Sequence, residues 1–64
     1  MKVNGKDLEP TPQMTVGDLV LSVGCRPDRV AVELNGKIVP RSDYSSVLLK
    51  NDDSVEIVGF VGGG

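Results

Sequence analysis

The residues with the clearest chemical use are the glycines at the end of the sequence, Gly62, Gly63 and Gly64, which follow Val61. Glycine has no Cβ, so a glycine tail is thin and its backbone is free to adopt many conformations. Such a tail can carry a terminal α-carboxylate into the narrow active site of another protein. A frayed chain end is the alternative, because termini are often disordered. The residues before the tail must decide between the two interpretations.

Other reactive side chains are scarce. The sequence has no histidine, which is the commonest general base and metal ligand in proteins. The single cysteine, Cys25, can form neither an intrachain disulfide nor a zinc site by itself. Asp52 and Asp53 are adjacent carboxylates, but the polar residues around them are typical of a solvated turn. We therefore expect no catalytic residue, no metal site and no bound cofactor.

Length and charge limit the partners. Sixty-four residues make one small domain. The net charge of −2, one tyrosine, one phenylalanine and no tryptophan argue against nucleic-acid binding. The sequence has neither a signal peptide nor an apolar run near the ~20 residues that span a bilayer, so we expect no membrane association. Small secreted domains often carry several disulfides, and one cysteine cannot form any within the chain, so we expect the protein in the reducing cytoplasm.

Two Asn-Gly pairs are the strongest local signals. Asn4-Gly5 separates short expected strands at residues 1–3 and 6–9, and Asn35-Gly36 separates strands at residues 30–34 and 37–39. Asn-Gly is the preferred pair for the type I′ turn of a β-hairpin. The sequence therefore predicts two hairpins.

A helix is predicted between the hairpins, over residues 16–23. Thr15 is its expected N-cap, with Asp18 completing a capping box, and Gly24 suits the position after its last turn. The expected inward face of this helix carries four residues at helical spacing: Val16, Leu19, Val20 and Val23.

The remaining segments complete an α+β arrangement. Residues 41–46 are expected to form a short turn or a helical turn with Tyr44 packed inward. Residues 47–49 are expected to form an edge segment or a core-filling loop. The final strand, at residues 55–61, follows a long connection and can lie in the middle of the sheet beside the first strand. We predict a four- or five-stranded mixed sheet packed on one main helix. The domain is expected to span residues 1–61, with residues 62–64 as a flexible arm.

Alternation along the final strand separates its two faces. Val55 and Ile57 are predicted to face the core, which puts Val58 and Phe60 on the opposite, open face. An apolar pair beside the glycines is a candidate docking site for a partner, although Phe60 could instead cover the edge of the small core. Gly59 indicates either a β-bulge or a close backbone approach.

These motifs, in this order, resemble the ThiS family of thiamine-biosynthesis sulfur carriers, which have the ubiquitin-like β-grasp fold. The likeness rests on residues 3–6 (VNGK), 15–19 (TVGDL), 32–42 (VELNGKIVPRS) and 50–58 (KNDDSVEIV), followed by the terminal glycines. It covers the whole chain. The family commonly ends in two glycines, whereas this sequence ends in three.

The resemblance implies a carrier rather than an enzyme. A ThiF-like adenylating enzyme would activate the carboxylate of Gly64 with ATP, and a persulfide from a donor such as a cysteine desulfurase would replace the adenylate. The covalent states would be a C-terminal glycyl adenylate and 1-thioglycine. A ThiG-like thiazole synthase would then use the sulfur. Gly62 and Gly63 would form the flexible arm, Val58 and Phe60 would dock partners, and the free protein would be a monomer.

Three alternatives remain open at this level. The chain could be a sulfur carrier for molybdopterin synthesis, although that carrier is typically longer, or a modifier conjugated to lysines. It could also be a β-grasp interaction module with an inert tail. Cys25 could hold a transient persulfide, but it follows a helix C-terminus, which does not lower a thiol pKa as an N-terminus does.

Overall fold

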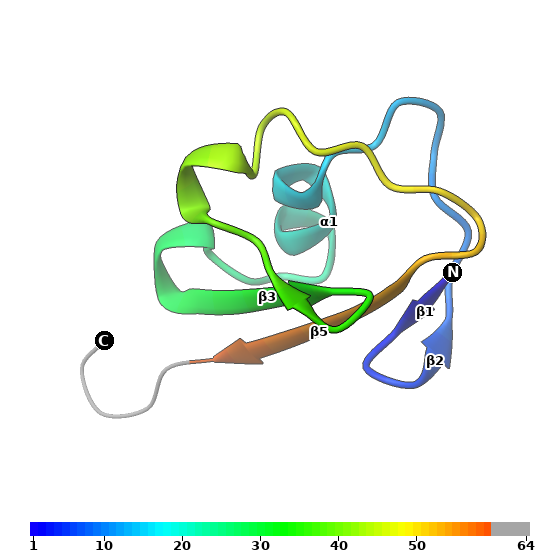
Figure 1. Ribbon diagram of the computed structural model, residues 1–64, viewed down its shortest axis with the longest axis horizontal. Helices are drawn as coiled ribbons and strands as arrows, with labels where there is room; N and C mark the ends of the chain where they lie inside the picture. Colours follow the sequence, from blue (N-terminus) through cyan, green and yellow to red (C-terminus); the bar gives the residue numbers. More distant parts are fainter. Residues whose placement is uncertain (60–64) are drawn as a thin grey trace.

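The computed structural model describes residues 1–59, and it arranges them as a five-stranded sheet with one α-helix on a single face (Figure 1). The strand order is β2-β1-β5-β3-β4. The elements, in chain order, are β1 (Lys2–Val3), β2 (Lys6–Asp7), α1 (Val16–Ser22), η1 (Pro27–Arg29), β3 (Val30–Leu34), β4 (Lys37–Ile38), η2 (Arg41–Asp43) and β5 (Ser54–Gly59).

The last strand, β5, lies at the centre of the sheet. It runs parallel to β1 and antiparallel to β3, in continuous register from Val30 opposite Gly59 to Leu34 opposite Val55. A hairpin flanks it on each side, β1–β2 and β3–β4. The predicted mixed sheet, with its first and last strands side by side, is therefore confirmed.

Both hairpins turn as their sequences predict. Asn4 and Gly5 have φ values of 50° and 84°, and Asn35 and Gly36 have 53° and 84°. Positive φ at both central residues is the mark of a type I′ turn. The returning strands β2 and β4 are shorter than expected, with two residues each.

The helix begins with the predicted capping box. The Asp18 backbone N–H donates to Thr15 Oγ1, and the Thr15 backbone N–H donates to Asp18 Oδ2, both at 3.0 Å. Gly24 follows the helix with a φ of 84°, as predicted. The predicted inward position of Val23 is wrong, because this residue is the C-cap, beyond the last full turn, and its side chain is 42% exposed.

Gly17 brings the helix close to the segment after η2. Its backbone N–H donates to the Tyr44 carbonyl oxygen at 2.8 Å, and a Cβ at Gly17 would lie 3.3 Å from that oxygen. The Tyr44 ring is buried, as predicted, and its hydroxyl donates to the Val30 carbonyl oxygen at 3.3 Å. This contact fixes α1 against the start of β3.

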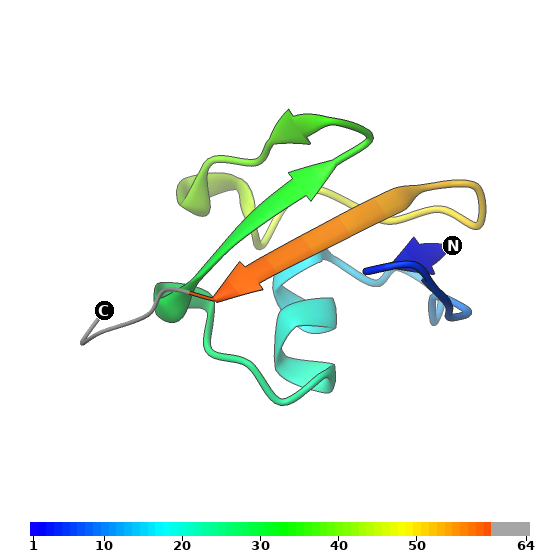
Figure 2. The same cartoon turned by 90° about the horizontal axis from the view of Figure 1, so that it is seen from below.

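The hydrophobic core lies between α1 and the sheet (Figure 2). The loop before β5 closes it from the side. Leu49 is buried and fills the core, whereas Leu48 is exposed and forms an isolated bridge with Thr15. Of the two interpretations of residues 47–49, the core-filling loop is therefore correct. The fully or nearly fully buried side chains of the core are Val16, Leu19, Val20, Val32 and Val55.

No helix within residues 1–59 combines the length and the apolar character needed to cross a membrane.

Candidate functional site

The candidate site is the end of the chain, and the structure describes the strand that leads to it. The predicted arm and sulfur-carrying residues Gly62, Gly63 and Gly64, and the predicted docking residue Phe60, lie outside the described residues. Their roles stay predictions. The described part of the site is β5, which ends at Gly59, and the surfaces on either side of it.

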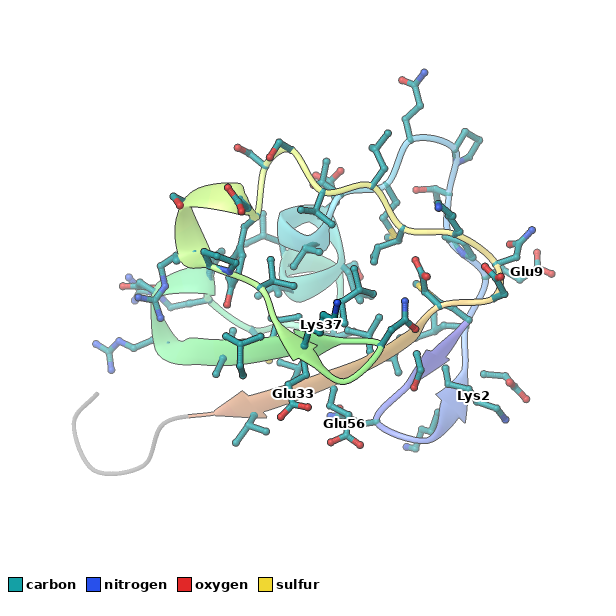
Figure 3. All side chains as sticks on the ribbon, viewed as in Figure 1. Lys2, Glu9, Glu33, Lys37 and Glu56 are labelled. Atoms are coloured by element: carbon teal, nitrogen blue, oxygen red, sulfur yellow. The ribbon has the colours of Figure 1, made fainter. Side chains whose placement is uncertain are left out.

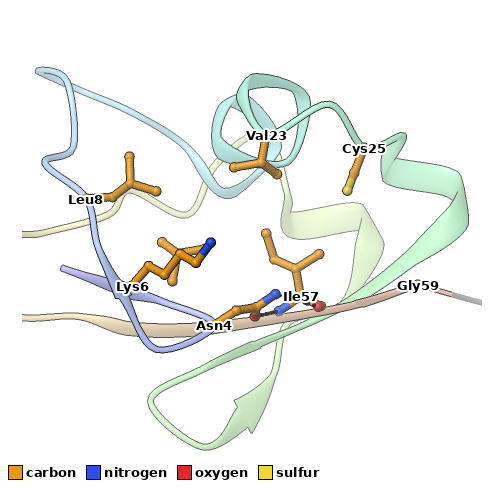
Figure 4. A pocket seen from close by; sticks show the side chains of 8 residues that line it. Asn4, Lys6, Leu8, Val23, Cys25, Ile57 and Gly59 are labelled. Atoms are coloured by element: carbon orange, nitrogen blue, oxygen red, sulfur yellow. Dashed lines mark hydrogen bonds between the residues drawn. The ribbon is translucent and has the colours of Figure 1, made fainter.

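Asn4 holds β5 where its ladder with β1 ends. The Ile57 backbone N–H donates to Asn4 Oδ1 at 2.7 Å, and Asn4 Nδ2 donates to the Ile57 carbonyl oxygen at 3.1 Å (Figure 4). The Asn4 side-chain amide thereby makes the two hydrogen bonds that the backbone of a further β1 residue would make to β5. The two-residue strand β1 consequently supports β5 beyond its own length.

Asn35 holds the beginning of β5 in a similar way. The Ser54 backbone N–H donates to Asn35 Oδ1 at 2.9 Å, and the Asn35 backbone N–H donates to the Ser54 carbonyl oxygen at 2.8 Å. Asn35 Nδ2 also donates to Asp53 Oδ1 at 3.0 Å. Both turn asparagines therefore bind β5 with their side chains, which the sequence analysis missed.

Asp53 corrects the prediction of a solvated turn. Its side chain is 8% exposed, and its second oxygen, Oδ2, accepts from the Lys50 backbone N–H at 2.8 Å. Together with the bond from Asn35, this satisfies both carboxylate oxygens. Asp52 is exposed, as expected. The pair still has no acid–base geometry, because Asp53 serves to tie the turn to β5.

The two faces of β5 follow the predicted alternation over its described length. Val55 is buried and Ile57 is packed against the core, whereas Val58 is 57% exposed on the opposite side. The exposed position of Val58 agrees with a docking role, which itself stays a prediction. Both interpretations of Gly59 are wrong: its pairing with Val30 continues the regular register, and a Cβ there would have no neighbour within 4 Å.

A groove of about 300 Å³ lies on the helix side of β5 (Figure 4). It separates the β1–β2 hairpin from the segment that follows α1. Cys25 is half-buried in its wall, close to where β5 ends. The groove is mostly apolar, and its lining residues are Val3, Asn4, Lys6, Leu8, Val23, Cys25, Ile57 and Gly59.

Ionisable groups in the described part of the chain provide little for catalysis. Within residues 1–59, no group of three His, Cys, Asp or Glu side chains is placed to hold a metal ion. Lys2 Nζ lies 3.0 Å from Asp7 Oδ1, and its hydrogen bond and positive charge lower the pKa of that exposed carboxyl. This pair lies on the sheet surface rather than in a cleft.

Comparisons with known proteins agree on one family. The sequence model of the ThiS family matches residues 1–64. The chain is 38% identical over 65 residues to the sulfur carrier protein ThiS of Bacillus subtilis, covering 100% of this chain and 98% of the relative. It is also 39% identical over 62 residues to a thiazole synthase of Magnetococcus marinus, covering 97% of this chain.

The thiazole synthase is a much larger protein, and this chain spans only 19% of its length. A second thiazole synthase, from Paramagnetospirillum magneticum, is 42% identical over 62 residues, with the same 19% of its length covered. The fold is also similar to the crystal structure of the thiamine biosynthesis protein ThiS from Geobacter metallireducens. That match has a TM-score of 0.77 and 30% identity, and covers 98% of this chain and 96% of the other.

Proposed function

The chain belongs to the ThiS family, and on this premise we propose that it is a sulfur carrier protein of thiamine biosynthesis. The observation that carries the proposal is the full-length similarity to a ThiS sulfur carrier, together with the glycines that end the sequence. The carboxylate of Gly64 is the group that carries sulfur, and Gly62 and Gly63 are the arm.

The chemistry needs an activated carboxylate, because a free carboxylate at neutral pH is a poor electrophile. An oxygen of Gly64 attacks the α-phosphorus of ATP, pyrophosphate leaves, and a glycyl adenylate forms. The terminal sulfur of a persulfide then attacks the carbonyl carbon and expels AMP. A thiol breaks the resulting S–S bond and leaves 1-thioglycine, the C-terminal thiocarboxylate. These covalent states take the place of a bound cofactor.

The described residues hold in place the strand that leads to the reacting carboxylate. β5 is held on one side by β1 and Asn4 and on the other by β3 and Asn35. Five residues follow Gly59 in the sequence, and five extended residues reach at most about 17 Å. The carboxylate can therefore enter a partner's active site while the folded domain stays outside. In this proposal the chain is a protein substrate and not a catalyst.

Three partners follow from the proposal. Thiazole synthase is supported by the two thiazole synthases that contain a stretch similar to this chain, since carrier and synthase then occur in one polypeptide. A ThiF-like enzyme would adenylate Gly64, and a cysteine desulfurase would supply the persulfide. Such persulfide chemistry requires a reducing compartment, so we place the protein in the cytoplasm.

The proposal is tested by intact mass spectrometry of the chain after incubation with the adenylating enzyme, ATP, cysteine and cysteine desulfurase. We expect the exchange of one carboxylate oxygen for sulfur, confined to the C-terminal peptide. The product should support thiazole formation by purified thiazole synthase. A variant extended by one alanine after Gly64 is the control, and it should stay unmodified. Modification of the extended variant, or no sulfur on the wild type, would refute the proposal.

A further inference from the structure

The turn between β3 and β4 contains a chemically reactive pair of residues, Asn35 and Gly36. In an asparagine followed by glycine, the side-chain amide is lost readily, because glycine has no Cβ to shield its backbone nitrogen. That nitrogen can attack the side-chain carbonyl carbon of the asparagine. Both Asn35 and Gly36 are exposed. The turn therefore brings the reacting groups together where water can reach them.

The attacking nitrogen is free, whereas the amide that it attacks is held. Within residues 1–59, the Gly36 backbone N–H is paired with no backbone carbonyl. Asn35 Oδ1 accepts from the Ser54 backbone N–H at 2.9 Å, and Asn35 Nδ2 donates to Asp53 Oδ1 at 3.0 Å. Both bonds are distorted when the planar Cγ becomes tetrahedral. The folded state therefore slows the reaction without removing the nucleophile.

The reaction exchanges the amide of Asn35 for a carboxylate. The Gly36 nitrogen bonds to Cγ, the bond from Cγ to Nδ2 breaks, and Nδ2 leaves as ammonia with the proton of the Gly36 N–H. Water then opens the succinimide ring. Opening at Cγ gives an aspartate, and opening at the main-chain carbonyl carbon gives an isoaspartate, whose main chain is longer by one carbon. Water is the co-reactant, and no oxidant or reductant is needed.

Asp53 makes the aspartate product unfavourable for the fold. Asn35 Nδ2 lies 3.0 Å from Asp53 Oδ1, so the reaction places a negatively charged oxygen where a donor had been. Asp53 is buried, and its other oxygen already accepts from the Lys50 backbone N–H at 2.8 Å. Two carboxylates in contact repel each other, and burial reduces the screening of that repulsion by water and salt.

The described residues do not neutralise the added charge. The ion pairs within residues 1–59 are Lys2–Asp7 and Arg26–Asp28, so none includes Asp53. Lys37 follows the turn on β4 (Figure 3). It is exposed, and an exposed ion pair formed with it would offset little of the repulsion.

The isoaspartate product disturbs the turn itself. The turn joins its strands through two residues with φ values of 53° and 84°. An additional main-chain carbon changes this geometry and the pairing of Leu34 with Lys37 that depends on it. Either product therefore weakens the bond to Ser54, the residue at which β5 begins.

We propose that Asn35 is a spontaneous modification site, and that its conversion to aspartate or isoaspartate limits the lifetime of the folded domain. Asp53 acts in two ways. It holds the amide of Asn35, which slows the reaction, and it repels the carboxylate that the reaction produces. The inference does not depend on the proposed carrier function.

Asn4 and Gly5 provide a reference within the same molecule. The Asn4 side chain is also bonded at both ends, but to the backbone of Ile57. Its Nδ2 donates to the Ile57 carbonyl oxygen, so a carboxylate at position 4 would face a neutral group. We therefore expect conversion of Asn4 to cost less stability than conversion of Asn35.

The first experiment follows the full chain in mildly alkaline buffer at physiological temperature. Peptide mass spectrometry measures conversion at Asn35 and at Asn4 separately, while circular dichroism measures the folded fraction. Conversion of Asn35 in the wild type should precede loss of the fold. Asp53→Ala should accelerate conversion of Asn35 about three- to tenfold more than that of Asn4, the factor expected for one lost hydrogen bond. A general loss of stability would instead accelerate both sites alike.

The second experiment separates the repulsion from the loss of the amide. Asn35→Asp should lower the thermal midpoint by about 5–20 °C. The double variant Asn35→Asp/Asp53→Asn exchanges donor and acceptor, because the amide at position 53 can donate to the new carboxylate and accept from the Lys50 N–H. It should recover most of the loss. Asn4→Asp is the matched control, and it should lower the midpoint by clearly less than Asn35→Asp.

The following results would overturn the inference. A wild type that unfolds with Asn35 intact would show that this site does not limit its lifetime. Equal acceleration of both asparagines in Asp53→Ala would show that Asp53 does not protect Asn35. A midpoint of Asn35→Asp equal to that of the wild type would show that the product is tolerated. If the double variant is no more stable than Asn35→Asp, repulsion by Asp53 is not the cause. Should Asn35→Asp fail to fold, recovery of folding in the double variant supports the proposal, and its absence contradicts it.

Discussion

Asp53 is the buried polar residue of the described chain, and its carboxylate joins a turn to the central strand. Asp53→Ala would leave the Asn35 side-chain amide and the Lys50 backbone N–H without their acceptor. We expect a loss of about 1–3 kcal/mol in the free energy of unfolding, measured by urea denaturation. The neighbouring Asp52→Ala is the control, since Asp52 is exposed, and it should stay within about 0.5 kcal/mol of wild type. Equal effects would contradict this role.

Asn4 has two functions that substitution can separate. Asn4→Gly keeps a residue that tolerates the φ of 50° in the turn but removes both side-chain bonds to Ile57. We expect a loss of about 0.5–1.5 kcal/mol in stability. Hydrogen exchange at the Ile57 amide should become faster in the variant. Unchanged exchange there would show that the turn, and not the amide, is what the fold needs.

The sequence predicts the first of these functions and not the second. Asn-Gly identifies a type I′ turn from two adjacent residues, because the signal is a local backbone preference. The bonds from Asn4 to Ile57 join positions 53 residues apart, and no local pattern contains that contact. The one available hint is that both turns use asparagine, although glycine or aspartate would also satisfy the turn.

At the scale of the element, β5 presents one apolar side chain that the core does not use. Val58→Thr keeps a β-branched residue in the strand while making the exposed position polar. We expect stability within about 0.5 kcal/mol of wild type and binding to thiazole synthase weaker by about 1 kcal/mol. Leu21→Gln is the control, because it alters a similarly exposed apolar residue on α1, and it should leave binding unchanged.

Loss of the fold in Val58→Thr, or normal affinity in a folded variant, would contradict docking at this position.

The same two measurements, stability and affinity for thiazole synthase, apply to Phe60→Ala. If Phe60 belongs to the core, its removal should cost about 3–5 kcal/mol, enough to unfold a domain of this size.

Elements with strong local signals could be predicted in detail, whereas contacts between distant residues were predicted only in part. The capping box and the apolar spacing of α1 lie within a few residues, so the helix could be predicted from Thr15 to Gly24. The loop at residues 47–49 is fixed by the bridge from Leu48 to Thr15, across the fold. The close approach of Gly17 to Tyr44 is likewise a tertiary contact, so no local sequence pattern indicates it.

For the whole molecule, the fold and the sulfur-carrying end should be separable. Deleting Gly63 and Gly64 removes residues without side chains, whereas the core is built from residues between Val3 and Val55. We expect the thermal midpoint to stay within about 2 °C of wild type, since little apolar surface is lost. Adenylation, measured as ATP–pyrophosphate exchange, should be abolished. A large drop in the midpoint, or normal exchange, would count against this division.

The central position of β5 also determines how the domain responds to force. A partner that holds the C-terminus and moves away pulls along the strand axis. The hydrogen bonds of β5 to β1 and β3 lie across that axis, so the load falls on both ladders together in shear. A strand at the sheet edge, pulled across its ladder, would instead unzip one bond after another. The domain can therefore be withdrawn from an active site by its C-terminal residues while it stays folded.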